Sequence, residues 1–192
     1  MTRAGFRTLV ALSMATVTAS TIPAASPGAA STRTQSTASV TGSARVFYPQ
    51  APDDDVRFTF DAQAVSPAAG EVPHPAEAAG TVRVHHRVAA LNLTLWAEGE
   101  VNCVMTSGRA STLTAIVTKT SPELTQSWLG KHLGFTVFDG GDDESGHSLD
   151  QMGSTGPVEN LAECMAGSPN APVMAPAPFF TVRSGGYRVT SG

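Results

Sequence analysis

Strict alternation of apolar and polar side chains is the feature that most constrains the fold of this chain. In the segment 56–62 the side chains of Val56, Phe58, Phe60 and Ala62 fall on one side, and polar side chains fall on the other. The same alternation recurs at 81–88, 91–97, 101–105, 111–119 and 133–137. Successive side chains of a strand point to opposite faces, so the pattern predicts half-buried antiparallel strands.

The C-terminal segment 178–189 predicts two further short strands joined about Gly185 and Gly186. Turn-forming residues separate the predicted strands at regular intervals, which is typical of small barrels and sandwiches. We therefore expect an all-β fold: a single-domain antiparallel β-barrel or sandwich with one or two short helices.

Two segments break the alternation and predict those helices. In 121–130, Ser121 is placed as an N-cap, Pro122 follows at the first helical position, and Gly130 ends the segment. In 158–167, the apolar side chains recur at helical spacing and a glycine again ends the stripe.

Residues 1–30 have the layout of a secretory signal peptide. Two arginines form a positive start, an apolar run follows over 8–19, and small residues come next. The run is shorter than the roughly 20 residues that a membrane-spanning helix needs. Small residues permit cleavage after Ala19 or after Ala30, and we favour the later site. We therefore expect a secreted protein.

Charge and composition argue against two classes of partner. Removing residues 1–30 takes away two arginines and no acid, so Lys plus Arg falls from 12 to 10 against 16 acids, and the net charge is near −6. Nucleic acids and anionic membranes select basic surfaces, so we expect neither as a partner, and we expect a monomer.

Residues 31–42 are rich in Ser and Thr and predict a flexible leader, followed by one β-domain over 43–192.

The chain has two cysteines, Cys103 and Cys164. An even count in an exported protein indicates a disulfide, although two buried free thiols remain the alternative. Alternation places Cys103 on the same strand face as Val101 and Met105. A disulfide would therefore fix the predicted second helix to this strand.

Three segments carry a resemblance to a known group: GSARVFYPQAPDDDVRFTFDA, GEVNCVMTSGRASTLTAIVT and GFTVFDGGDDESGHSLDQM. Together they resemble small secreted actinobacterial proteins that are often labelled repetin, over roughly Gly42 to the C-terminus. The resemblance implies a secreted all-β domain and implies no particular activity. A Pro- and Ala-rich insert at 66–79 departs from the pattern of the group.

The densest cluster of potential metal ligands is the acidic segment FDGGDDESGHSLD. Asp139, Asp142, Asp143 and Asp150 could supply ligand oxygens, and two glycines would let the backbone turn. Ca²⁺ takes six to eight such oxygens, but the spacing does not match an EF-hand loop. Because Asp, Gly and Ser also form solvated turns, we favour a polar hairpin loop without a cofactor, with a Ca²⁺ site as the alternative.

Two further patterns could support an enzyme. The acidic segment contains Ser, His and Asp, but the groups of a catalytic triad converge from separate elements and not from one loop. Glu98 and Glu100 would share a strand face about 6.6 Å apart, within the range of inverting glycosidase carboxylates. A solvated strand face explains the same two residues and is the interpretation we favour.

His86 falls on the apolar face of its predicted strand. A histidine in that position is more often a hydrogen-bonded core residue than a ligand. In a barrel wide enough to hold a small molecule, the same residue would face the lumen.

The residues thus favour a secreted, disulfide-linked β-domain acting as an extracellular binding or structural module. The alternative is a secreted hydrolase that uses an acidic-loop metal or the Glu98/Glu100 pair.

Overall fold

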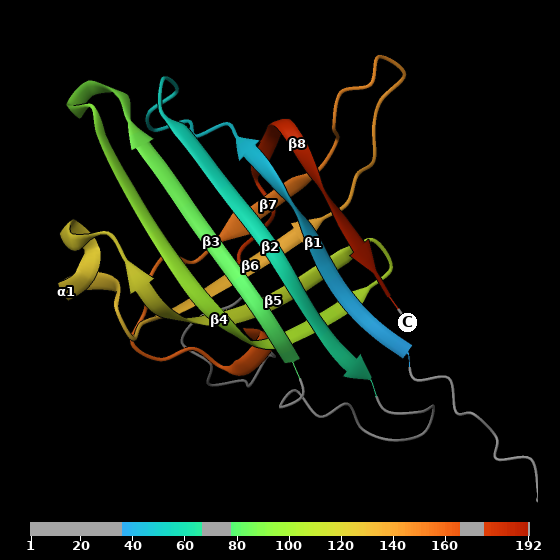
Figure 1. Cartoon of the computed structure of the whole chain (residues 1–192). Coiled ribbons are helices and arrows are strands. Elements are labelled where there is room, and N and C mark those ends of the chain that lie inside the picture. Colours follow the sequence, from blue (N-terminus) through green and yellow to red (C-terminus); the bar gives the residue numbers. More distant parts are fainter. Residues whose placement is uncertain (1–35, 67–77, 166–174, 192) are drawn as a thin grey trace, which may run out of the picture. The chain divides into compact units, whose positions relative to one another are not determined.

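A computed structural model describes residues 36–66, 78–165 and 175–191. Within them, eight antiparallel strands form a closed barrel in which each strand pairs with the next and β8 closes on β1 (Figure 1). The strands are β1 (Ser36–Val46), β2 (Asp55–Ser66), β3 (Ala78–Val88), β4 (Leu93–Ser107), β5 (Ala110–Thr120), β6 (His132–Phe138), β7 (Gln151–Ser154) and β8 (Phe180–Thr190). The predicted all-β, single-domain antiparallel barrel is confirmed.

The register of the strands explains the alternation seen in the sequence. Phe58 of β2 lies opposite Val84 of β3, and Phe60 lies opposite Val82, so both strands turn the same face inward. Aromatic side chains fill the middle of the barrel, where the Phe60 ring lies 5.3 Å from Phe135, centroid to centroid. These edge-on contacts add to the free energy gained by burying the rings.

A β-bulge in β4 changes which face Cys103 occupies. Val101 pairs with Ala115 and the next paired residue is Cys103, opposite Thr114, so one residue is extra between them. A bulge of this kind reverses the alternation that follows it. Cys103 therefore leaves the face of Val101 for the outer face, and the prediction that the two share a face is wrong.

The C-terminal segment forms one continuous strand, β8, and not two short strands about a Gly-Gly turn. Its register with β1 shifts between Arg45 and Val46, so Gly185 lies in an irregular stretch of the strand. Gly185 has a φ of +80°, and a Cβ there would approach the carbonyl oxygen of Ser43 to 2.2 Å. The glycine thus allows β8 to pass close to β1 where a turn was expected.

The N-terminal prediction is partly wrong. β1 begins at Ser36, so residues 36–42 pair with β2 and do not form a flexible leader. The polar side chains of this segment alternate with small core residues, Ala38 and Val40, which are buried. The predicted signal peptide, residues 1–30, lies outside the described residues.

The first predicted helix is present as two short pieces, η3 (Pro122–Leu124) and α1 (Thr125–Trp128). The second prediction is wrong over most of its length. Val158 bridges to His132, and within the described residues 158–165 helical structure is limited to the turn η4 (Glu163–Met165). Pairing with the start of β6 outweighs the helical spacing of the apolar side chains.

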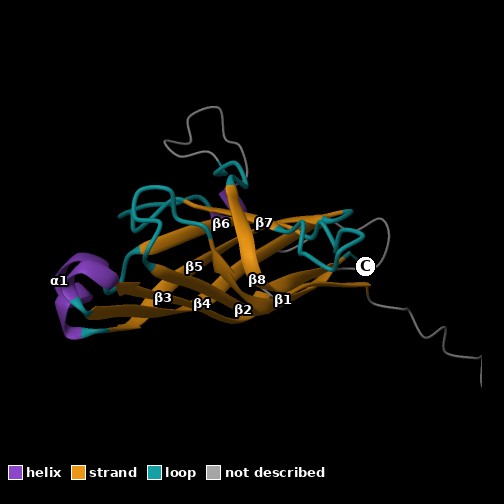
Figure 2. Ribbon diagram, turned by 90° about the horizontal axis from the view of Figure 1, so that it is seen from above, coloured by secondary structure: helices purple, strands orange, loops and turns teal. Residues whose placement is uncertain are grey.

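The barrel has two ends that carry different loops. At the α1 end, β1, β3, β5 and β7 finish; the connections there include α1 and the short turn η2 (Ala89–Leu91). Figure 1 shows α1 at the left and the C-terminal end of β8 at the lower right, and Figure 2 shows the same separation from above. The acidic segment connects β6 to β7 at the opposite end, because β6 starts at the α1 end and runs away from it.

No helix in the described part of the chain is long and apolar enough to cross a membrane.

Candidate functional site

A cavity of about 250 Å³ lies at the α1 end of the barrel. Its walls come from the loop after β1, the start of β2, the end of β3, the start of β4, α1, and the end of β7 with the start of β8. Aromatic residues dominate the lining: Tyr48, Phe58, Trp96, Trp128 and Phe180. Aliphatic side chains supply most of the rest, so the cavity is chiefly apolar.

His86 is the one imidazole among the lining residues. Its Nε2 lies 2.6 Å from Oδ2 of Asp54, a short hydrogen bond between a half-buried ring and a buried carboxylate. His86 is thus hydrogen-bonded to Asp54 and also lines the cavity. A carboxylate bound to one ring nitrogen fixes the orientation of the ring and its tautomer.

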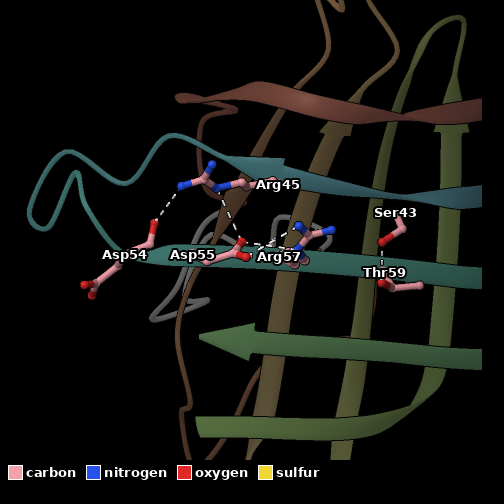
Figure 3. Close-up of polar contacts among 6 residues, drawn as sticks. All are labelled: Ser43, Arg45, Asp54, Asp55, Arg57 and Thr59. Carbon is pink, nitrogen blue, oxygen red and sulfur yellow. Dashed lines mark hydrogen bonds and ion pairs between the residues drawn. The ribbon is translucent and has the colours of Figure 1, made fainter. Parts of the chain in front are cut away.

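Two backbone contacts hold Asp54 beneath the ring. Oδ1 accepts a hydrogen bond from the backbone N–H of Ala89 at 2.9 Å. The guanidinium of Arg45 donates to the backbone carbonyl of Asp54, and in Figure 3 the carboxylate points away from that arginine. Arg45 and Arg57 instead share the next carboxylate, that of Asp55. The carboxylate of Asp54 therefore bonds to His86, and the two arginines bond to the carboxylate of Asp55.

These hydrogen bonds favour the ionised form of Asp54. The N–H of Ala89, and next the hydrogen bond from His86, lower the pKa of the carboxyl below its ordinary value, while desolvation opposes them. An ionised carboxylate has only acceptor oxygens, so the hydrogen between the two groups belongs to Nε2 of His86. Nδ1 is then the acceptor nitrogen of the neutral ring.

Aromatic rings surround the imidazole on the cavity side. The Tyr48 ring packs edge-on to His86 at 5.6 Å between centroids, and the ring of Phe180 lies 5.8 Å from Tyr48. The site thus combines an apolar wall with one oriented polar group, which is the usual composition of a small-molecule site.

The acidic segment has a different organisation, in which carboxylates bind backbone N–H groups. Asp150 is buried; its Oδ1 accepts from the N–H groups of Gly140 and Gly141, and its Oδ2 accepts from the N–H of Tyr187 at 2.6 Å. The segment is therefore a hydrogen-bonded hairpin loop that is fastened to β8 by Asp150.

The other predicted metal ligands are dispersed around this loop. Asp139 accepts from the N–H of Val189 and pairs with Arg109. Asp143 caps the loop tip, where the N–H groups of His147 and then Ser145 lower the pKa of its carboxyl. Across the described ranges, no three His, Cys, Asp or Glu side chains gather around a common point.

Asp142, the fourth predicted ligand, contributes to the loop through its backbone. It forms an isolated antiparallel bridge with Ser148 that closes the hairpin. Asp142 is exposed at the surface.

Glu98 and Glu100 lie on β4 but not in the cavity. The carboxylate of Glu98 accepts hydrogen bonds from Lys119 at 2.7 Å and from Arg83 at 2.8 Å. Both cations lower the pKa of the carboxyl, and Lys119 has the larger effect. An acid of this kind stays ionised and does not supply a proton near neutral pH. Glu100 is exposed. The pair therefore lacks the environment of a glycosidase acid and base.

The disulfide between Cys103 and Cys164 is present, with the Cα atoms 5.3 Å apart. It holds the η4 turn against the outer face of β4 and β5, where the N–H of Cys164 also donates to Oγ1 of Thr114. Thr114 in turn bonds to Asn102, the residue inserted at the bulge. The bulge thus turns Cys103 towards its partner.

Asp54 is the site residue that sequence reasoning missed. It is the middle member of a run of three aspartates, 53–55, and only Asp54 is buried. Alternation offers one signal: Val56 faces inward, so a residue two positions earlier on an extended chain faces the same way.

In comparisons with known proteins, no protein-family model, no curated protein and no solved structure matched this chain.

Proposed function

We propose that this protein is an extracellular binding module whose ligand is a small, largely apolar molecule held in the cavity at the α1 end. The observation that carries the proposal is the cavity itself, an aromatic-lined space next to a core of buried apolar side chains. Burial of apolar ligand surface there would drive binding, and the oriented His86 would provide specificity.

The rest of the barrel supports a binding role because it forms a rigid frame for this space. The closed strand order leaves no sheet edge open, and the disulfide links the chain across the outer face of β4 and β5. The cavity opens where short loops and α1 meet, and those elements carry few of the core residues. Ligand entry therefore requires movement of loops and not of the barrel.

The extracellular location is part of the proposal. A disulfide-linked domain fits an oxidising compartment, and the sequence of residues 1–30 is that of an export signal. N-terminal sequencing of protein recovered from culture medium tests it: a start near residue 20 or 31 supports export. Intact Met1 on protein confined to the cytosol contradicts it.

The hydrolase alternative has less support. Glu98 is engaged by two cations on the outer face, and the loop carboxylates mainly bind backbone N–H groups. The carboxylates of Asp139, Asp142 and Asp150 line a second pocket at the opposite end of the barrel, but those of Asp139 and Asp150 already accept hydrogen bonds from backbone N–H groups. A binding module is therefore the function that the geometry supports best.

Calorimetric titration with toluene, a probe with no hydrogen-bonding group, tests the binding role. Val84 lines the cavity, so Val84→Trp fills part of it and should abolish binding. The matched control is Thr94→Trp, at an exposed position on the neighbouring strand β4. Binding by the wild type and the control but not by Val84→Trp supports the proposal. Failure of the wild type to bind overturns it.

A further inference from the structure

One ring nitrogen of His86, Nδ1, does not bond to Asp54. This atom can distinguish an apolar ligand that carries a hydrogen-bonding group from one that does not. Nε2 is committed to Asp54 at 2.6 Å. Among the described residues, no hydrogen bond reaches Nδ1 of the same ring. The ring lines the cavity and is half-buried, and Nδ1 is the ring nitrogen that does not bond to Asp54.

The acceptor character of Nδ1 follows from the contacts of Asp54. Its carboxylate takes one hydrogen bond from Ala89 and a second from the imidazole, and both favour the ionised form. A carboxylate cannot donate, so Nε2 carries the hydrogen and Nδ1 presents a lone pair. A ligand group that meets Nδ1 must therefore donate a hydrogen bond.

Ser154 is a less suitable recognition group than His86. Ser154 at the end of β7 lines the space, but its Oγ accepts from the N–H of Gly156 within the same turn. His86 is held from behind by a buried carboxylate, whereas Ser154 is held only by its own loop. Orientation makes the imidazole the better recognition group.

We infer that the cavity takes a small phenol or ring alcohol, whose hydroxyl group donates a hydrogen bond to Nδ1 of His86 while its ring lies among the aromatic side chains. This inference rests on the proposed binding function and adds the chemical class of the ligand. The volume agrees with it: a cavity of about 150 Å³ holds benzene, so 250 Å³ accommodates a substituted ring or two fused rings. The lining aromatics Tyr48, Phe58 and Phe180 suit a ring better than a flexible chain.

Three probes of similar shape separate the contributions to binding. Toluene has no polar group, para-cresol adds a hydroxyl donor, and para-tolunitrile adds an acceptor only. The affinity of each for the wild-type protein is measured by NMR titration at pH 8. We expect para-cresol to bind about five-fold tighter than toluene, the equivalent of one net hydrogen bond, and para-tolunitrile to bind no tighter than toluene.

Two variants test the roles of the histidine and its carboxylate. His86→Gln keeps an N–H for Asp54 but takes the acceptor away from the position of Nδ1, so the ratio of para-cresol affinity to toluene affinity should fall towards one. Asp54→Asn can still accept from Ala89 and turns its amide N–H towards Nε2. Nδ1 then carries the hydrogen, and the preference should reverse towards para-tolunitrile. A purely structural role of Asp54 predicts no such reversal.

The outcomes distinguish the inference from the function on which it rests. If all three probes bind the wild type equally, the ligand class is wrong and the binding module stands. If none of the probes binds, the proposed function fails and this inference fails with it. If His86→Gln does not fold, as judged by its ¹H–¹⁵N spectrum, Asp54→Asn decides: an unchanged preference for para-cresol overturns the inference, and a reversed one supports it.

Discussion

The carboxylate of Asp150 and the backbone N–H of Tyr187 lie 2.6 Å apart, although the two residues are 37 positions apart in the chain. The other oxygen of Asp150 binds two N–H groups of the loop that it closes. One side chain thus joins the acidic loop to β8 near the seam where the barrel closes. The presence of Asp150 among the clustered acids of this loop is therefore explained by the hydrogen bonds that hold the loop together and join it to β8.

Replacing Asp150 should therefore be costly. Asp150→Ala leaves several buried N–H groups without a partner, and we expect the free energy of unfolding to fall by about 3 kcal/mol. Urea unfolding measures the change. Asp142→Ala, in the same loop but at an exposed position, is the control and should change stability by less than about 0.5 kcal/mol. Equal effects of the two substitutions would contradict the structural role of Asp150.

Calcium should have no effect on stability if backbone N–H groups occupy these carboxylates. We expect the thermal midpoint to be the same in Ca²⁺ and in chelator, because bound metal would have to displace the hydrogen bonds of Asp139, Asp143 and Asp150. The measurement is thermal melting under both conditions. A calcium-dependent rise that Asp139→Asn or Asp143→Asn abolishes would establish the metal site instead.

The hydrogen bond between Asp54 and His86 beneath the cavity predicts a pH dependence. The folded-state pKa of Asp54 is lowered, so its contribution is present above the unfolded value of about 3.9 and is lost as pH falls through the folded value. Between pH 5 and pH 2 the wild type should thus lose more stability than Asp54→Asn. Asp53→Asn, at the exposed neighbouring position, should behave as the wild type does. Acid unfolding curves compare the three proteins, and parallel curves for wild type and Asp54→Asn would refute the prediction.

The disulfide should supply a large part of the stability. It closes a loop with a sequence separation of 61, and the chain-entropy model gives about 4 kcal/mol for a loop of this length. The double variant Cys103→Ala/Cys164→Ala should lose about that amount in urea unfolding, and reduced wild type should match it. A double variant as stable as the oxidised wild type would contradict this expectation.

The fold could be predicted from the sequence because the barrel satisfies one simple rule, inward and outward alternation. Where the prediction from the sequence failed, a local change in the backbone had overridden the alternation. The extra residue at Asn102 turned Cys103 outward, and the freedom of Gly185 let a strand continue where a turn was expected. Pairing with His132 drew Val158 out of a predicted helix. Each depends on contacts with a neighbouring strand, which spacing within one segment does not reveal.

The candidate site was only half visible in the sequence. His86 was recognisable because a polar residue interrupts an apolar face. Asp54 was not, because three adjacent aspartates look alike until the fold buries one of them and pairs it with a histidine 32 positions away. Sites assembled across strands depend on register, and register becomes known only with the structure.

The central claim is that a small apolar molecule enters the α1 end of the barrel. The most direct test is the ¹H–¹⁵N spectrum of the labelled protein during titration with toluene. We predict saturable shifts at amides of cavity-lining residues such as His86, Ala97 and Gly156, with none at Gly141 and Gly186 at the opposite end. No shifts at the cavity amides, or equal shifts at both ends of the barrel, would contradict the account.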